Sequence, residues 1–192
     1  TVSKEKRKNN HKYNLLCHRY FMRSLGWGII TAATIYLASL VLPENETPWI
    51  AFFIIMLYTL MEIDKRMLLL PDILTVPLLI VGFSYAVFAG GMLGYEPAAS
   101  AANSALGAAA GYVIPVIASL FLIKKYPEAF GGGDIKLLSA VGSWVGLTNI
   151  PYVILLSCLL FAVSCFINKQ RQGAFGPSIV IASLIILFLS EY

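Results

Sequence analysis

Residues 131–136 read GGGDIK, in a chain that is otherwise largely apolar. Three consecutive glycines have a poor helix propensity and pack no side chain, so they leave the backbone free to adopt unusual angles. We interpret Gly131, Gly132 and Gly133 as a loop that another backbone can approach closely. Asp134 follows this loop directly, near the expected depth of a lipid bilayer. An acid at that depth is by default a candidate functional residue.

The composition is that of an integral membrane protein. Of the 192 residues, 58% are hydrophobic and 12% are charged, whereas soluble domains average about 45–50% and about 25%. We do not interpret the net charge of +4 as a sign of nucleic-acid binding, because membrane topology explains where the basic residues lie. The three cysteines, Cys17, Cys158 and Cys165, form no CxxC pair. They therefore predict neither a disulfide framework nor a zinc site.

Seven apolar segments predict an all-α fold, a polytopic transmembrane bundle of about six to seven helices. A spanning helix needs about 20 residues. Segment 134–147 is shorter and contains Lys136, so we expect it to span only partly or to tilt in from one face. Small residues in 98–112, and Gly142 and Gly146 four apart, predict close helix packing. The expected segments are 25–42, 48–63, 73–93, 99–123, 134–147, 151–167 and 175–190.

The lysines and arginines predict how the bundle is oriented. They all fall on connections that lie on one side of the membrane, and the positive-inside rule makes that side cytoplasmic. We therefore expect residues 1–23 to form a basic cytoplasmic tail, and residues 24–192 to form a transmembrane core in contact with the bilayer. The basic stretches are 1–23, 64–72, 124–133 with Lys136, and 168–174, whereas connections 43–47, 94–98 and 148–150 contain no basic residue.

Two acids are predicted to meet at the cytoplasmic face. Asp64 ends the second expected helix and Asp134 begins the fifth, so two full crossings return the chain to the same side. Taken singly, Asp64 could be an ordinary helix-end acid, and Asp134 and Asp72 could be helix caps. Two neighbouring carboxylates, however, cannot easily both ionise. They can share a water molecule as one acid and one base, as in aspartic proteases, with no metal or other cofactor.

Three blocks of the sequence resemble a known family. Residues 131–134 match the GxGD signature of membrane aspartyl proteases, and DIKLL at 134–138 resembles its prepilin peptidase form, GxGDxKLL. MEIDKRMLLLPDILTVP at 61–77 resembles the block of that family in which ID is followed by LPD and LTLP. FGP at 175–177 resembles the motif that opens the family's last helix. Together the blocks cover roughly residues 55–185 in the family's order.

The resemblance implies that Asp64 and Asp134 are the catalytic pair of a membrane endopeptidase. It implies substrates of one class, the precursors of type IV pilins and of type II secretion pseudopilins. Their short basic leader would be removed at the cytoplasmic face of the bacterial inner membrane. Lys136 could instead be a snorkelling lysine. The supporting or substrate-binding residues would be Gly131, Gly132, Gly133, Lys136, Asp72 and Pro71.

The chain departs from the family pattern in one respect. Many members carry a cytoplasmic domain with two CxxC pairs that is linked to N-methylation of the new pilin terminus, and this sequence contains no CxxC. The resemblance therefore does not extend to methyltransferase activity. Because the sequence begins at Thr1 rather than Met, it is either a short, peptidase-only form or part of a longer product.

Three alternatives stay open. One is another GxGD protease of the preflagellin or presenilin-like kind, although the latter expects a tyrosine where this chain has Ile63. A second is a small transporter in which the acids bind protons or cations. A third is a non-catalytic assembly factor that keeps both aspartates. The sequence does not indicate which precursor is cut, or whether the protein forms a homodimer.

Overall fold

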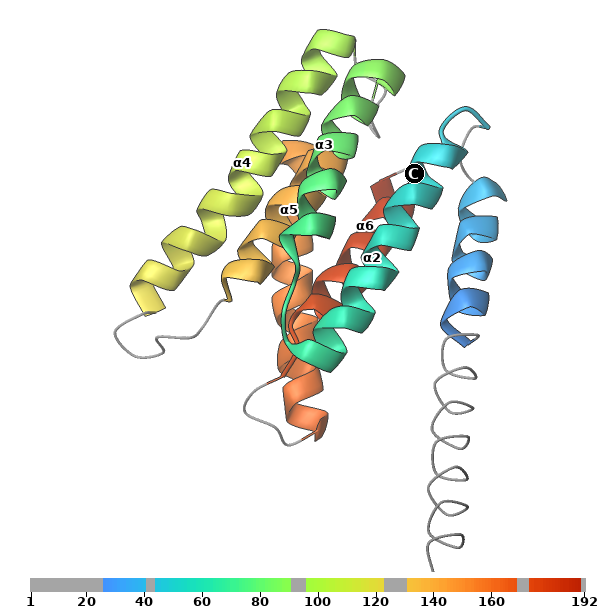
Figure 1. The fold of residues 1–192 in the computed structure, drawn as a ribbon. Coiled ribbons are helices and arrows are strands. Elements are labelled where there is room, and N and C mark those ends of the chain that lie inside the picture. Colours follow the sequence, from blue (N-terminus) through green and yellow to red (C-terminus); the bar gives the residue numbers. More distant parts are fainter. Residues whose placement is uncertain (1–25, 41–43, 91–95, 123–130, 169–172, 191–192) are drawn as a thin grey trace, which may run out of the picture.

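A computed structural model describes residues 26–40, 44–90, 96–122, 131–168 and 173–190 (Figure 1). These residues form an all-α bundle, as predicted. Most of the basic stretches, including the tail 1–23, Lys124, Lys125, Lys169 and Arg171, lie outside the described residues. The helices are an N-terminal helix Gly26–Leu40, then α2 Thr47–Met67, α3 Asp72–Ala89, α4 Pro97–Leu122, α5 Gly132–Asn168 and α6 Gly176–Ser190.

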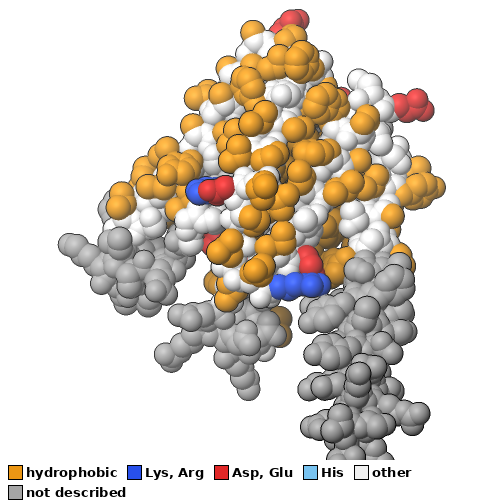
Figure 2. Space-filling view, in the orientation of Figure 1, with side chains coloured by type: hydrophobic (Ala, Val, Ile, Leu, Met, Phe, Trp, Pro, Cys, Tyr) orange, Lys and Arg blue, Asp and Glu red, His pale blue; other side chains and the backbone are white. Residues whose placement is uncertain are grey.

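The helices have the length and surface of membrane-spanning segments. Four of them, α2 to α5, are long and apolar enough to cross a membrane. Helix α2 has 21 residues, which gives about 31 Å at a rise of about 1.5 Å per residue and matches a hydrocarbon core of about 30 Å. Large apolar side chains such as Ile73, Phe88 and Phe166 are strongly exposed, and Figure 2 shows hydrophobic side chains covering much of the visible face. The chain is a membrane protein.

Helix α5 contains two arms that run in opposite directions, so the described residues hold seven helical segments (Figure 1). The chain reverses at Gly146, whose φ of 75° and ψ of 176° are not helical. The predicted connection at 148–150 is therefore wrong, because these residues lie inside the second arm and Pro151 lies within that helix rather than at its start. The first arm, residues 132–145, is about 21 Å long, shorter than the hydrocarbon core.

The reversal depends on a side chain from another helix. Asn103 of α4 accepts a hydrogen bond from the backbone N–H of Leu147, 2.9 Å from N to Oδ1. It therefore supplies the acceptor that a helix-capping residue normally provides. Gly146 is packed against the same Asn103 side chain, which leaves no room for a Cβ. A left-handed φ and this close contact together require glycine at the reversal.

Small residues bring α4 against the first arm of α5, as predicted. A Cβ on Gly107 would overlap the backbone of Gly142 and Gly146, and one on Gly111 would overlap the carbonyl of Leu138. Ser104 donates a hydrogen bond of 2.7 Å to the carbonyl oxygen of Ser143 across the same contact. The two backbones therefore approach as closely as glycine allows, which is the usual way that membrane helices associate.

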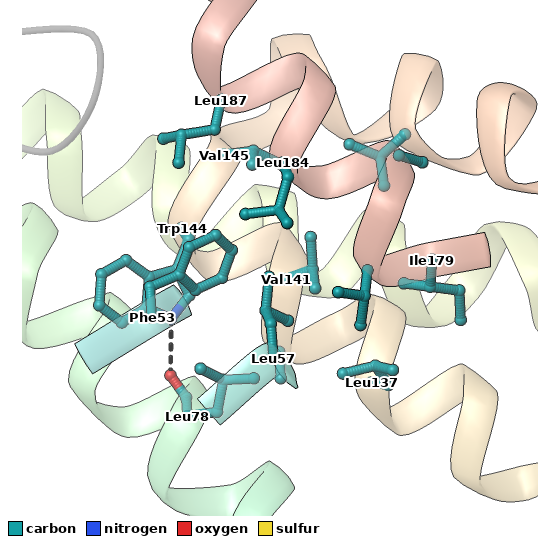
Figure 3. Close-up of a cluster of buried hydrophobic side chains, with 14 of the residues drawn as sticks. Phe53, Leu57, Leu78, Leu137, Val141, Trp144, Val145, Ile179, Leu184 and Leu187 are labelled. Carbon is teal, nitrogen blue, oxygen red and sulfur yellow. Dashed lines mark hydrogen bonds between the residues drawn. The ribbon is translucent and has the colours of Figure 1, made fainter. Parts of the chain in front are cut away.

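The core joins α2, α3, α5 and α6 around Trp144 (Figure 3). The indole Nε1 donates to the carbonyl oxygen of Leu78, 2.8 Å away. The ring of Phe53 stacks on the indole at a centroid distance of 4.7 Å, and that of Tyr85 at 5.4 Å. Tyr85 also donates a 2.8 Å hydrogen bond to Glu46 at the start of α2. These contacts hold α2, α3 and α5 together at the end of the bundle opposite the two acids.

The N-terminal helix contacts α2 along one side. Lys65 lies over the ring of Trp27 at 4.7 Å, and the same ring packs against Tyr58. The hydroxyls of Thr34 and Tyr58 are 3.1 Å apart and share a hydrogen bond. Lys65, the residue after Asp64, is thereby engaged with the N-terminal helix.

Candidate active site

Asp64 lies in the last turn of α2, with only 5% of its surface exposed. Its Oδ2 atom accepts a hydrogen bond of 2.8 Å from the backbone N–H of Gly176, the first residue of α6. A Cβ on Gly176 would lie 2.6 Å from that oxygen and 3.1 Å from the Asp64 Cγ atom. The carboxylate therefore occupies the space that any side chain at position 176 would need.

Asp134 lies in the first turn of α5, half-buried beside Asp64. The turn is closed by the carbonyl oxygen of Gly131, which accepts from the backbone nitrogens of Asp134 at 3.1 Å and Ile135 at 3.3 Å. The Asp134 and Asp64 side chains are close enough for the charge of one to affect the other. The structure thus brings together at one end of the bundle two acids that are 70 positions apart in the sequence.

The three glycines are less of a loop than the sequence indicated. Gly132 and Gly133 begin helix α5, and Gly131 alone precedes it. Gly131 and Gly132 are exposed, and nothing lies within 4 Å of a Cβ built on Gly132. Gly133 faces inward, where its Cβ would lie 3.0 Å from the Cβ of Leu70. A Cβ on Gly131 would likewise lie 3.0 Å from Asp134 Oδ2, so the first and third glycines are in close contact and Gly132 is not.

We expect alanine substitutions at these positions to have opposite effects on stability. Gly132→Ala should be neutral or stabilising by up to about 1 kcal/mol, because alanine has the better helix propensity. Gly133→Ala should destabilise by about 1–3 kcal/mol, because the buried Leu70 has to move. Thermal unfolding of the purified variants measures both. Equal losses of stability would contradict this account of the glycine run.

Asp72 and Lys136 form an ion pair that links the starts of α3 and α5. Lys136 Nζ lies 2.7 and 2.8 Å from the two oxygens of Asp72, and both side chains are about half exposed. Asp72 does not cap α3: it is the first helical residue, and Pro71 holds the cap position with no side-chain hydrogen bond. The carbonyl oxygen of Pro71 instead accepts from the backbone nitrogens of Leu74 and Thr75. Lys136, two residues after Asp134, is thus engaged by Asp72.

The contact between α6 and Asp64 was not predicted. The FGP block at 175–177 was recognised only as a motif that opens the last helix, and its residues were not among the candidates. Nothing local in the sequence connects Gly176 with an aspartate 112 positions away. The available signal was a glycine directly before Pro177 at a helix start, a position where glycine is not needed for the helix itself.

Comparison with known proteins identifies the family of the chain. Residues 51–166, which include both aspartates, match the model of the type IV leader peptidase family. The chain belongs to that family. No solved structure matches the chain.

Several curated relatives of the chain carry the same name, prepilin leader peptidase/N-methyltransferase. The chain is 30% identical over 181 residues to the one from Vibrio cholerae, covering 88% of this chain and 65% of that protein. It is 42% identical over 135 residues to the one from Xanthomonas campestris pv. campestris, covering 66% and 44%. With the protein from Aeromonas hydrophila the identity is 34% over 149 residues, covering 72% and 48%. The chain therefore spans about half to two thirds of the length of these relatives.

Proposed function

We propose that the protein is a membrane-embedded aspartic endopeptidase that removes the leader from type IV prepilins or type II secretion pseudopilins. The observation that carries the proposal is the meeting of Asp64 and Asp134, one buried and one half-buried, at one end of the bundle. Membership of the leader peptidase family and the names of the relatives support the substrate class. The exposed Gly131 and Gly132 leave room for an extended substrate backbone beside Asp134.

The two carboxyl groups provide the proton transfers that peptide hydrolysis needs. One carboxylate takes a proton from a water molecule, whose oxygen bonds to the scissile carbonyl carbon. The other, protonated group gives its proton to the carbonyl oxygen, forming a gem-diol. As the C–N bond breaks, the first group passes its proton to the leaving amine, and the second regains one from a diol hydroxyl. One water is consumed and the pair returns to its starting state.

We further propose that this end of the bundle faces the cytoplasm and that the N-terminus is cytoplasmic. Lys65 and Arg66 lie in the last turn of α2, beside the two acids. Glu46 and Glu96 lie at the opposite ends of their helices, before α2 and α4. This asymmetry is what the positive-inside rule associates with a cytoplasmic face. Cleavage would then occur where the leader of an inserted precursor leaves the bilayer, in the bacterial inner membrane.

Co-expression with a tagged prepilin tests the proposal. The precursor carries a basic leader and a glycine before the scissile bond, and the product is read by intact mass spectrometry. We expect one cut directly after the glycine. The cleaved product should be absent from a host that lacks the enzyme. The same spectrum shows whether the new terminus gains the mass of one methylene, which is the net addition on N-methylation. A well-inserted protein that leaves several prepilins uncut would favour the transporter or assembly-factor alternative.

The two-carboxylate mechanism predicts a bell-shaped dependence of kcat/KM on pH. Activity should fall at low pH, where both groups are protonated, and at high pH, where neither carries a proton to donate. Cleavage of a purified prepilin in detergent, measured across pH with and without EDTA, checks this. We expect EDTA to leave the rate unchanged. Loss of activity with the chelator, restored by a divalent metal, would contradict a mechanism that rests on the two acids alone.

A further inference from the structure

Resting on the proposed function, we infer that the backbone N–H of Gly176 positions Asp64 for catalysis, so that the start of α6 is a third component of the site. The contact is direct: Gly176 N–H donates to Asp64 Oδ2 at 2.8 Å in a buried position. This hydrogen bond fixes the orientation of the Asp64 carboxylate at the end of the bundle where Asp134 also lies. Gly176 acts through Asp64 and does not itself touch substrate.

The first turn of α6 offers this one donor to the carboxylate. Pro177 has no N–H. The next two backbone nitrogens, of Ser178 and Ile179, donate to the carbonyl oxygen of Phe175 at 2.9 and 3.2 Å. Gly176 N–H is therefore the donor at the helix start that is left for Asp64. The positive end of the α6 dipole adds to its effect, because it favours the charged form of an adjacent carboxylate.

This donor also offsets an unfavourable location. Asp64 lies in the last turn of α2, and its own carbonyl oxygen accepts from Leu68 N–H at 2.9 Å. The negative end of a helix dipole disfavours a carboxylate. A buried carboxylate there needs a compensating hydrogen bond, and the start of α6 provides it.

The position of the donor is set by its neighbours. The Phe175 ring packs edge-on against Phe161 in the second arm of α5, with centroids 5.2 Å apart. On the other side, the missing side chain at Gly176 lets the Asp64 carboxylate come within hydrogen-bonding distance. The three residues of the FGP block thus have separate tasks. Phe175 anchors the start of the helix, Gly176 supplies the donor and the space, and Pro177, the second helical residue, adds no competing N–H.

An amide-to-ester exchange tests the inference without adding atoms to the site. Glycolic acid at position 176 replaces the N–H with an oxygen. We expect kcat for prepilin cleavage to fall about 10- to 100-fold, as for loss of a hydrogen bond to a charged group, with KM unchanged. The acid limb of the pH profile should move to higher pH, because the charged form of the pair loses a donor. The control is the same exchange at Ile181, which removes a helical N–H at an exposed position.

The outcomes separate this inference from the proposed function. If the ester at 176 has the kcat and pH profile of the ester at 181 while the unmodified protein cleaves, the positioning role is overturned and the peptidase stands. If the unmodified, folded protein cleaves no prepilin, both are overturned.

A stability measurement tests the contact independently of activity. Gly176→Ala should lower the melting temperature, because its Cβ overlaps the carboxylate. In an Asp64→Ala background that loss should shrink to less than half. If Gly176→Ala lowers the melting temperature by the same amount in both backgrounds, the side chain at position 176 does not contact Asp64, and the inference is overturned.

Discussion

Replacing either Asp64 or Asp134 with asparagine is expected to reduce prepilin cleavage by at least about 10³-fold, which in a cell is no detectable processing. Asparagine keeps the size of the side chain, and its carbonyl oxygen can still accept from Gly176 N–H at position 64. The asparagine amide, however, can neither take a proton from water nor donate one to the carbonyl oxygen of the scissile peptide bond. The loss should therefore lie in kcat rather than in KM or in membrane insertion. Single-turnover cleavage by purified variants measures it.

Asp72→Asn is the matched control for both variants. Asp72 is an acid at the same end of the bundle, but it is about half exposed and paired with Lys136. An exposed ion pair contributes about 0.2–1 kcal/mol, so this variant should lose less than about tenfold in rate. Substantial cleavage by Asp64→Asn or Asp134→Asn would remove that residue from the pair. Complete loss in a well-inserted Asp72→Asn variant would give Asp72 a larger part than the structure assigns to it.

Gly142→Ala is expected to destabilise the fold strongly, because its new methyl group would overlap the backbone of α4. Its Cβ would lie 2.7 Å from the carbonyl carbon of Gly107 and 3.1 Å from the nitrogen of Ala108, and both are backbone atoms of α4. A flexible side chain could rotate away, whereas here two whole helices must separate, and the nearby hydrogen bond from Ser104 to the Ser143 carbonyl would stretch. We expect a cost of about 3 kcal/mol. That lowers the melting temperature by about 6–12 °C in a chain of this size.

Gly28→Ala is the control for this substitution. It adds the same methyl group to a helix, but nothing lies within 4 Å of a Cβ at that position. The melting temperatures of the two variants are compared in detergent, with the loss of folded protein monitored by size-exclusion chromatography. If Gly142→Ala has the same melting temperature as Gly28→Ala, α4 and α5 do not approach as closely as described.

The sequence was sufficient to predict an all-α bundle and the position of both acids at one and the same end of it. These features depend on the length of the apolar segments and on the alternation of basic and non-basic connections. Both can be counted along the sequence without knowing which helices touch. The meeting of Asp64 and Asp134 followed from counting crossings between them. The small residues of 98–112, and Gly142 with Gly146, predicted close helix packing, but not that Gly107 would meet Gly142.

The position of the reversal in α5, at Gly146 rather than at 148–150, could not be predicted because its cause lies in another helix. Pro151 resembled a helix start, and residues 148–150 therefore resembled a connection. The turn is made instead at Gly146, where Asn103 of α4 accepts the exposed N–H of Leu147. A local pattern does not show such a remote acceptor.

The fine structure of the site was missed for a related reason. Three glycines predict an irregular backbone, but Gly132 and Gly133 become helical once the Gly131 carbonyl closes the first turn of α5. The partners of the charged residues depend on helix packing: Lys136 meets Asp72, and Asp64 meets Gly176. Residue type alone made Lys136 as plausible a neighbour of Asp134.

A double-variant cycle on the two aspartates tests most directly whether they act as one pair. Single-turnover rates of prepilin cleavage are measured, with enzyme in excess, for the wild type, Asp64→Asn, Asp134→Asn and the double variant. Two groups that share one water fail together once either is lost, so the double variant should cleave no more slowly than the slower single variant. Losses that multiply would show that the two acids act in separate steps or at separate places, and would contradict the account.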